Sequence, residues 1–233
     1  MSGPSAARRW LALSVTASAL LVWGNLIVPA LPGGAGVRTA GNVGGAVVLV
    51  VMARAGGLTW RELGIARSSW RSGARWGATT LAVVTAGYAV ALAVPTLRAL
   101  LGEPGVLGWS TGEVLGRALV LIPLGTVLCE EIAFRGVLLA SASRLLSARP
   151  ALVVTSVVFG LWHLRSAQPL AGSGVSPIPQ GASVAGIILL TAAGGVVFGW
   201  LRLRSGSLLA PIGLHLGTNS VGLVAAAIAV AAR

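Results

Sequence analysis

The chain has 233 residues, a mean hydropathy of +0.89 and only 9% charged residues, whereas soluble domains contain about 25%. So few polar side chains cannot cover the surface of a water-soluble domain, and the composition instead predicts a polytopic membrane protein. The net charge of +12 does not indicate nucleic-acid binding, because the arginines are scattered between apolar segments and form no basic run with interleaved aromatic residues.

The ionisable residues are of few kinds. Every basic residue is an arginine and every acidic residue is one of five glutamates. The single cysteine, Cys129, excludes an intramolecular disulfide framework and a Cys-rich zinc site. Two interpretations of Cys129 remain, a nucleophile or a small buried residue, and the second is the commoner.

Apolar segments without charge mark the expected membrane spans. The first follows Arg8 and Arg9 and is long for the apolar region of a signal peptide, so we interpret it as an uncleaved helix. The second, between Arg38 and Arg54, is short for a crossing that takes about 20 residues, and whether it spans fully is left open. The seven predicted spans cover residues 10–37, 38–54, 76–97, 114–146, 150–165, 182–201 and 207–231, with a Pro/Gly/Ser-rich loop expected at 166–181.

The arginines are unevenly divided among the connecting segments. With seven spans, the arginine-rich segments around residues 8–9, 54–75, 144–149 and 202–204 all fall on one side of the membrane. The positive-inside rule then predicts a multi-pass protein of the cell membrane with a cytoplasmic N-terminus. We expect an all-α transmembrane bundle in which residues 1–112 form N-terminal helices and residues 113–233 form the core that carries the polar motifs.

The fourth span carries the sequence EEIAFR at residues 130–135. A charge inside a bilayer costs roughly 2.5–3.5 kcal/mol on insertion scales, so such groups indicate function. Glu131 and Arg135 lie four residues apart on one helix face and are expected to form an ion pair. Glu130 points about 100° away and is left without this cation, as a general base would be. The structural alternative is a helix-pairing charge cluster or a helix end whose charges reach the interface.

The two histidines of the chain lie in two other spans. Phe159 and His163 share a helix face in the sequence FGLWH, and His215 and Asn219 share one in HLGTN. Each motif alone is compatible with a hydrogen bond that joins membrane helices. Three helices that each place costly polar groups in lipid are more simply explained by one shared site.

Such a site suits hydrolysis of an acyl bond. Glu130 with His163 would orient and deprotonate a water molecule, and His215 with Asn219 would donate hydrogen bonds to the oxyanion. The same side chains are also compatible with a metal site, because Glu130, His163 and His215 could hold Zn²⁺ with one free coordination position. We favour the metal-free interpretation, because Asn219 beside His215 suggests a pair of hydrogen-bond donors.

The three motifs together resemble the EExxxR, FxxxH and HxxxN patterns of the CPBP family, which contains the type II CAAX prenyl endopeptidases and bacteriocin-immunity-like bacterial relatives. The resemblance covers about residues 113–225. It implies an intramembrane protease fold, a catalytic core at 113–233, and catalytic roles for Glu130, His163, His215 and Asn219 like those argued above. It leaves Glu131, Arg135 and Phe159 as structural support for the site.

The resemblance also implies the partners: membrane lipid and a membrane-associated peptide or protein substrate, such as a prenylated CAAX protein. Two other functions remain open. A proton-coupled transporter would use Glu130 and the histidines as a relay. An immunity or partner-binding protein would need no catalysis at all.

Overall fold

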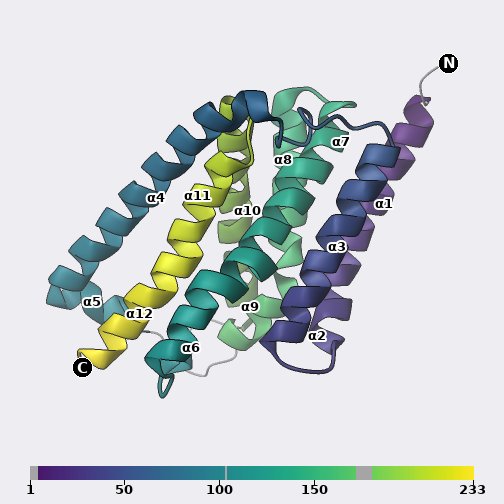
Figure 1. Ribbon diagram of the computed structural model, residues 1–233. Coiled ribbons are helices and arrows are strands. Elements are labelled where there is room, and N and C mark those ends of the chain that lie inside the picture. Colours follow the sequence, from purple (N-terminus) through teal and green to yellow (C-terminus); the bar gives the residue numbers. More distant parts are fainter. Residues whose placement is uncertain (1–4, 103, 172–179) are drawn as a thin grey trace.

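The computed structural model describes residues 5–102, 104–171 and 180–233, and every regular element within these ranges is helical (Figure 1). The α-helices are α1 (Ala6–Val22), α2 (Val28–Ala30), α3 (Ala35–Ala55), α4 (Trp70–Ala93), α5 (Pro95–Leu101), α6 (Thr111–Gly116), α7 (Leu139–Ser143), α8 (Ala148–Trp162), α9 (Leu164–Ala171), α10 (Gln180–Ser205), α11 (Leu209–Leu216) and α12 (Gly222–Ala231). The π-helical segments are η1 (Trp23–Ile27), η4 (Arg117–Leu121), η5 (Pro123–Leu128), η6 (Glu131–Leu138) and η7 (Gly217–Val221), and short 3₁₀ turns are η2 (Arg67–Ser69) and η3 (Pro104–Val106).

Six continuous helices within the described ranges are long and apolar enough to cross a membrane, which confirms the predicted all-α multi-pass bundle. They cover Ala6–Ala30, Ala35–Ala55, Arg67–Ala93, Thr111–Ser143, Gln180–Ser205 and Leu209–Ala231. The remaining expected span, the fifth at residues 150–165, corresponds to α8, which has only 15 residues. At 1.5 Å per residue it is about 22 Å long, short of the ~30 Å hydrocarbon core, because the helix ends at Trp162.

Two boundaries differ from those expected. The helix around the second apolar segment begins before Arg38 and has 21 residues, so it is about 31 Å long and sufficient for a full crossing. The loop expected at 166–181 is helical at both ends, since α9 continues to Ala171 and α10 begins at Gln180. Residues 172–179 of that predicted loop lie outside the described part of the chain.

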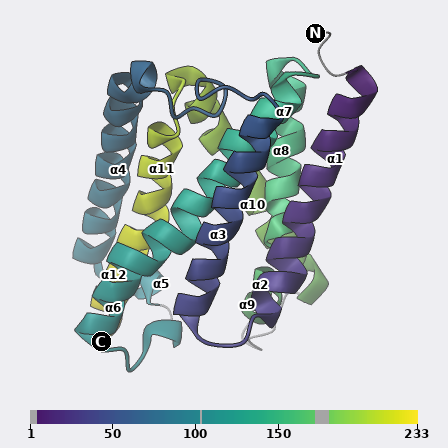
Figure 2. The ribbon, with the colours of Figure 1, turned by 45° about the vertical axis from the view of Figure 1, so that its right-hand side comes forward.

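The four arginine-rich segments meet at one end of the bundle, as predicted. Arg144 binds Glu62 of the connector between α3 and α4 at 2.6 Å and holds the pKa of that carboxyl at about 2. Arg202 donates to the backbone carbonyl of Glu62 at 2.6 Å. A groove between α1, α3 and α7 is lined by Arg8, Arg9 and Arg144. The chain termini lie at opposite ends of the bundle in two views (Figures 1 and 2).

The fourth span is one continuous helix of 33 residues, but much of it is π-helical. Pro123 lacks a backbone N–H, so the regular α-helical hydrogen bonding is interrupted there, and η5 begins at this residue. Glu130 lies at the junction between η5 and η6. π-helical turns within α-helices are often found at functional sites.

Glycines allow α4 and α11 to cross at backbone contact. A Cβ atom built on Gly77 would lie 2.3 Å from the Leu209 carbonyl oxygen, and one on Gly213 would lie 2.2 Å from the Gly77 carbonyl oxygen. No side chain fits at either position without a shift of a helix. This close crossing fixes α11, and with it His215, against the bundle.

Candidate active site

Two adjacent glutamates of the fourth span point into the protein. Glu131 is fully buried, Glu130 is 7% exposed and Arg135 is 3% exposed. The Arg135 Nη1 atom donates to Glu131 Oε1 at 3.2 Å, so the predicted ion pair is present. Because this pair neutralises one carboxylate, Glu130 is left as the acid without a guanidinium partner.

His215 of α11 contacts both carboxylates. Its Nδ1 atom lies 2.8 Å from Glu131 Oε1, and its Nε2 atom lies 3.9 Å from Glu130 Oε2. The ring is buried and stacks on Phe198 of α10, with ring centroids 4.9 Å apart and planes at 19°. Residues 84 positions apart in the sequence therefore form one polar cluster inside the bundle.

The hydrogen-bond network assigns the proton on this imidazole. An ionised carboxylate only accepts, so the hydrogen bond to Glu131 Oε1 requires a hydrogen on Nδ1 of His215, and Nε2 of the same ring is directed at Glu130. Glu130 Oε2 is also an acceptor, is buried, and has no hydrogen-bond partner in the described part of the chain. The 3.9 Å between His215 Nε2 and Glu130 Oε2 is a separation that one water molecule can bridge.

Arg135 lies in an aromatic box that contains all three phenylalanines of the chain. Its guanidinium carbon is 3.9 Å from the ring centroid of Phe159, 4.8 Å from that of Phe198 and 5.9 Å from that of Phe134. Cation–π contacts of this kind stabilise a desolvated cation. Phe159 thus supports the ion pair, in the structural role expected for it.

His163 lies at the end of α8, where its ring contacts Phe159. Its Nδ1 atom is 2.8 Å from the Phe159 carbonyl oxygen, and its ring packs edge-on against the Phe159 ring. In the described ranges no carboxylate oxygen lies within 4.0 Å of its nitrogens. His163 ends the helix, and the preceding residue, Trp162, donates the hydrogen bond to Glu130. The predicted role of His163, to orient a water molecule together with Glu130, stays a prediction.

Asn219 follows His215 in the same helix but across a change of helix type. It lies in η7 and is half-buried, and its Oδ1 atom accepts a hydrogen bond from Thr218 Oγ1 at 3.3 Å. Within the described residues it has no hydrogen bond to Glu130 or His215. Its role as an oxyanion donor stays a prediction.

The residues expected to hold Zn²⁺ do not form a three-ligand set. Across residues 5–102, 104–171 and 180–233, no group of three or more His, Cys, Asp or Glu side chains is placed to bind a metal ion. Glu130 and His215 approach each other, but His163 is turned toward the backbone of α8. The donor set therefore does not fit the catalytic zinc site considered from the sequence.

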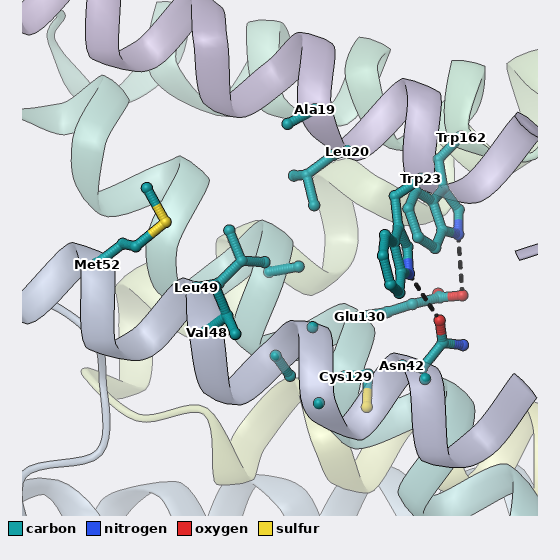
Figure 3. A pocket seen from close by; sticks show the side chains of 15 residues that line it. Ala19, Leu20, Trp23, Asn42, Val48, Leu49, Met52, Cys129, Glu130 and Trp162 are labelled. Carbon is teal, nitrogen blue, oxygen red and sulfur yellow. Dashed lines mark hydrogen bonds between the residues drawn. The ribbon is translucent and has the colours of Figure 1, made fainter. Parts of the chain in front are cut away.

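A cavity of about 450 Å³ opens beside Glu130 (Figure 3). It lies between α1 with η1, α3, and the fourth span, and its lining is almost entirely apolar. In the figure, the indoles of Trp23 and Trp162 lie at the end where Glu130 and Asn42 are found. Trp23 Nε1 donates to Asn42 Oδ1 at 2.9 Å, and Trp162 Nε1 donates to Glu130 Oε1 at 3.1 Å.

Sequence reasoning missed several residues of this region. The N-terminal 112 residues were expected to form helices apart from the core that carries the polar motifs, yet they form two walls of the cavity. Trp162 stands inside the FGLWH motif, next to His163, and that position was the available clue. For Phe198 the sequence offered no clue, because a single aromatic residue in an apolar span belongs to no recognisable motif. The division into two regions at residue 112 stays a prediction.

Residues 112–221 match a family model described as Type II CAAX prenyl endopeptidase Rce1-like. The matched range contains all three polar motifs, which confirms the resemblance predicted from them. No curated protein and no solved structure matches the chain.

Proposed function

We propose, from the match of residues 112–221 to the Rce1-like family, that this multi-pass membrane protein is an intramembrane endopeptidase that activates water with Glu130. The supporting observation is the buried Glu130 Oε2 atom, which has no partner in the described residues and faces His215 Nε2 at 3.9 Å. A water molecule that donates to both atoms would keep its lone pairs free to attack a carbonyl carbon.

The reaction would proceed in two proton transfers. Glu130 accepts a proton from the water as its oxygen bonds to the scissile carbonyl carbon. The C–N bond then breaks as that proton passes from Glu130 to the amine nitrogen, and Nε2 of His215 is placed to relay it. Glu131, which accepts from both His215 and Arg135, holds the imidazole in the tautomer that this step requires.

His163 and Asn219 complete the proposed site. The Nδ1 atom of His163 lies 2.8 Å from the Phe159 carbonyl oxygen, which leaves Nε2 as the nitrogen that we assign to handling the water proton. Asn219 has a carboxamide that can donate, and we assign it to the oxyanion. One such donor is worth roughly 3–4 kcal/mol in the transition state.

The cavity beside Glu130 supports a membrane-associated substrate. Its walls are apolar, and two of them come from membrane-spanning helices, α1 and α3. A prenylated CAAX-type peptide, whose apolar chain lies near the bond to be cut, suits such walls. We propose that the protein meets this substrate in the cell membrane.

The test is cleavage of a farnesylated CAAX peptide, and of its unprenylated form, by purified protein in proteoliposomes. The Glu130→Gln variant should lose at least about 100-fold in kcat, because the base is removed while the shape is kept. Glu113→Gln is the matched control: this exposed glutamate caps α6 through Ser110, and its loss should leave kcat unchanged. Cleavage by Glu130→Gln at the wild-type rate would refute the proposal.

A further inference from the structure

The two oxygens of Glu130 have different environments, and Trp162 causes the difference. Trp162 Nε1 donates to Oε1 at 3.1 Å, while Oε2 faces His215. An indole has one N–H in a fixed direction, so this bond determines the rotation of the carboxylate. If the N–H were absent, the carboxylate would be free to turn away from His215.

The indole itself is held by the first helix. A Cβ atom built on Gly24 of η1 would lie 2.5 Å from the indole ring, so the absence of a side chain there lets η1 lie directly on Trp162. Phe134 packs edge-on against the same indole, with ring centroids 5.4 Å apart. Figure 3 shows the indole beside the first helix, with its nitrogen directed at Glu130.

Asn25 fixes the backbone on both sides of Trp162. Its Nδ2 atom donates to the Leu161 carbonyl at 3.1 Å, and its Oδ1 atom accepts from the Arg165 backbone N–H at 2.8 Å. These groups belong to the break between α8 and α9, where helical hydrogen bonds are interrupted. One side chain of the first helix thus sets the turn that carries Trp162 and His163.

We infer that Trp162 is a positioning residue for Glu130, and that the first helix, through Gly24 and Asn25, holds Trp162 in place. This inference rests on the proposed function. It assigns the N-terminal helix, which lies outside the family match, a part in the active site. The long helix Ala6–Ala30 would then be required for turnover and not only for insertion.

The decisive variant is Trp162→Phe, which keeps an aromatic ring and removes the N–H. We expect kcat to fall roughly 10- to 100-fold, as for a lost hydrogen bond to a charged group, with KM and the thermal midpoint little changed. Trp200→Phe is the control, because Trp200 is 48% exposed and packs on Trp76 away from Glu130. It should behave as wild type.

Two further variants change residues of the first helix that hold the Trp162 indole and leave the indole itself intact. Gly24→Ala should also lower kcat, because the new methyl group pushes on the ring, and Asn25→Asp should do the same by removing the donor to Leu161. Gly87→Ala is the matched control, since a Cβ there meets no atom within 4 Å. The double variant Gly24→Ala/Trp162→Phe should be no slower than Trp162→Phe alone, since both changes act on one contact.

The outcomes separate this inference from the proposed function. If Glu130→Gln abolishes cleavage and Trp162→Phe retains the wild-type kcat, the positioning role is wrong and the protease proposal stands. If Trp162→Phe lowers the thermal midpoint and raises KM without reducing kcat, its role is structural and the inference is overturned. If Glu130→Gln cleaves normally, both fail together.

Discussion

A single oxygen atom, Glu131 Oε1, joins the groups of the polar cluster. It accepts from Arg135 at 3.2 Å and from His215 at 2.8 Å, while the other oxygen, Oε2, is buried without a partner in the described residues. The Arg135 cation thus compensates the buried Glu131 carboxylate, and the same carboxylate holds the His215 imidazole in position. Removal of either Glu131 or Arg135 leaves the other as an unpaired buried charge.

Arg135→Ala should therefore destabilise the protein by roughly 3–5 kcal/mol, because it leaves Glu131 as an unpaired buried carboxylate. It also removes the cation above the Phe159 ring. Glu130→Gln should cost less, since it removes a charge that has no cation partner. Arg71→Ala, an exposed arginine of α4, is the control. Unfolding in detergent measures the loss of stability in each variant. A greater loss for Glu130→Gln than for Arg135→Ala would mean that the Glu131–Arg135 ion pair is misassigned.

At the scale of helices, the site depends on how closely backbones approach. His215 reaches Glu131 only because α11 crosses α4 at the contact between Gly213 and Gly77. The fourth span contributes differently, through π-helical segments on either side of Glu130. Neither feature was predicted, because neither a glycine at a helix crossing nor a π-helical turn has a simple sequence pattern.

Gly77→Ala or Gly213→Ala should destabilise the protein by roughly 1–3 kcal/mol or more, because a methyl group would meet a backbone carbonyl that cannot move aside. The shift of α11 should also lower kcat by displacing His215. Gly87→Ala on the same helix α4 has open space at its Cβ and should be neutral or slightly stabilising. Thermal midpoints in detergent and cleavage rates test this; equal effects at Gly77 and Gly87 would show that the crossing is looser than described.

For the whole molecule, the spans could be predicted because charge and hydropathy alternate along the chain with the length of a membrane crossing. The three motifs could be predicted because polar groups in lipid are costly and few. The contacts between the three motifs could not be predicted from the sequence. His163 lies at a helix end that ordinary apolar residues gave no reason to expect. The contacts of Asn25 with the backbone of Leu161 and of the Trp162 indole with Glu130 join residues that only the folded chain brings together.

The orientation of the bundle remains to be measured, and the chain suits the measurement because its one cysteine, Cys129, is buried. Ser68 lies at the arginine-rich end, in the turn before α4, and Gly112 lies exposed at the opposite end, at the start of α6. The positive-inside rule predicts that the arginine-rich end faces the cytoplasm. A membrane-impermeant maleimide should therefore label Gly112→Cys in intact cells and Ser68→Cys only after permeabilisation, with the parent chain unlabelled throughout. The reverse pattern would invert the topology and place the N-terminus outside.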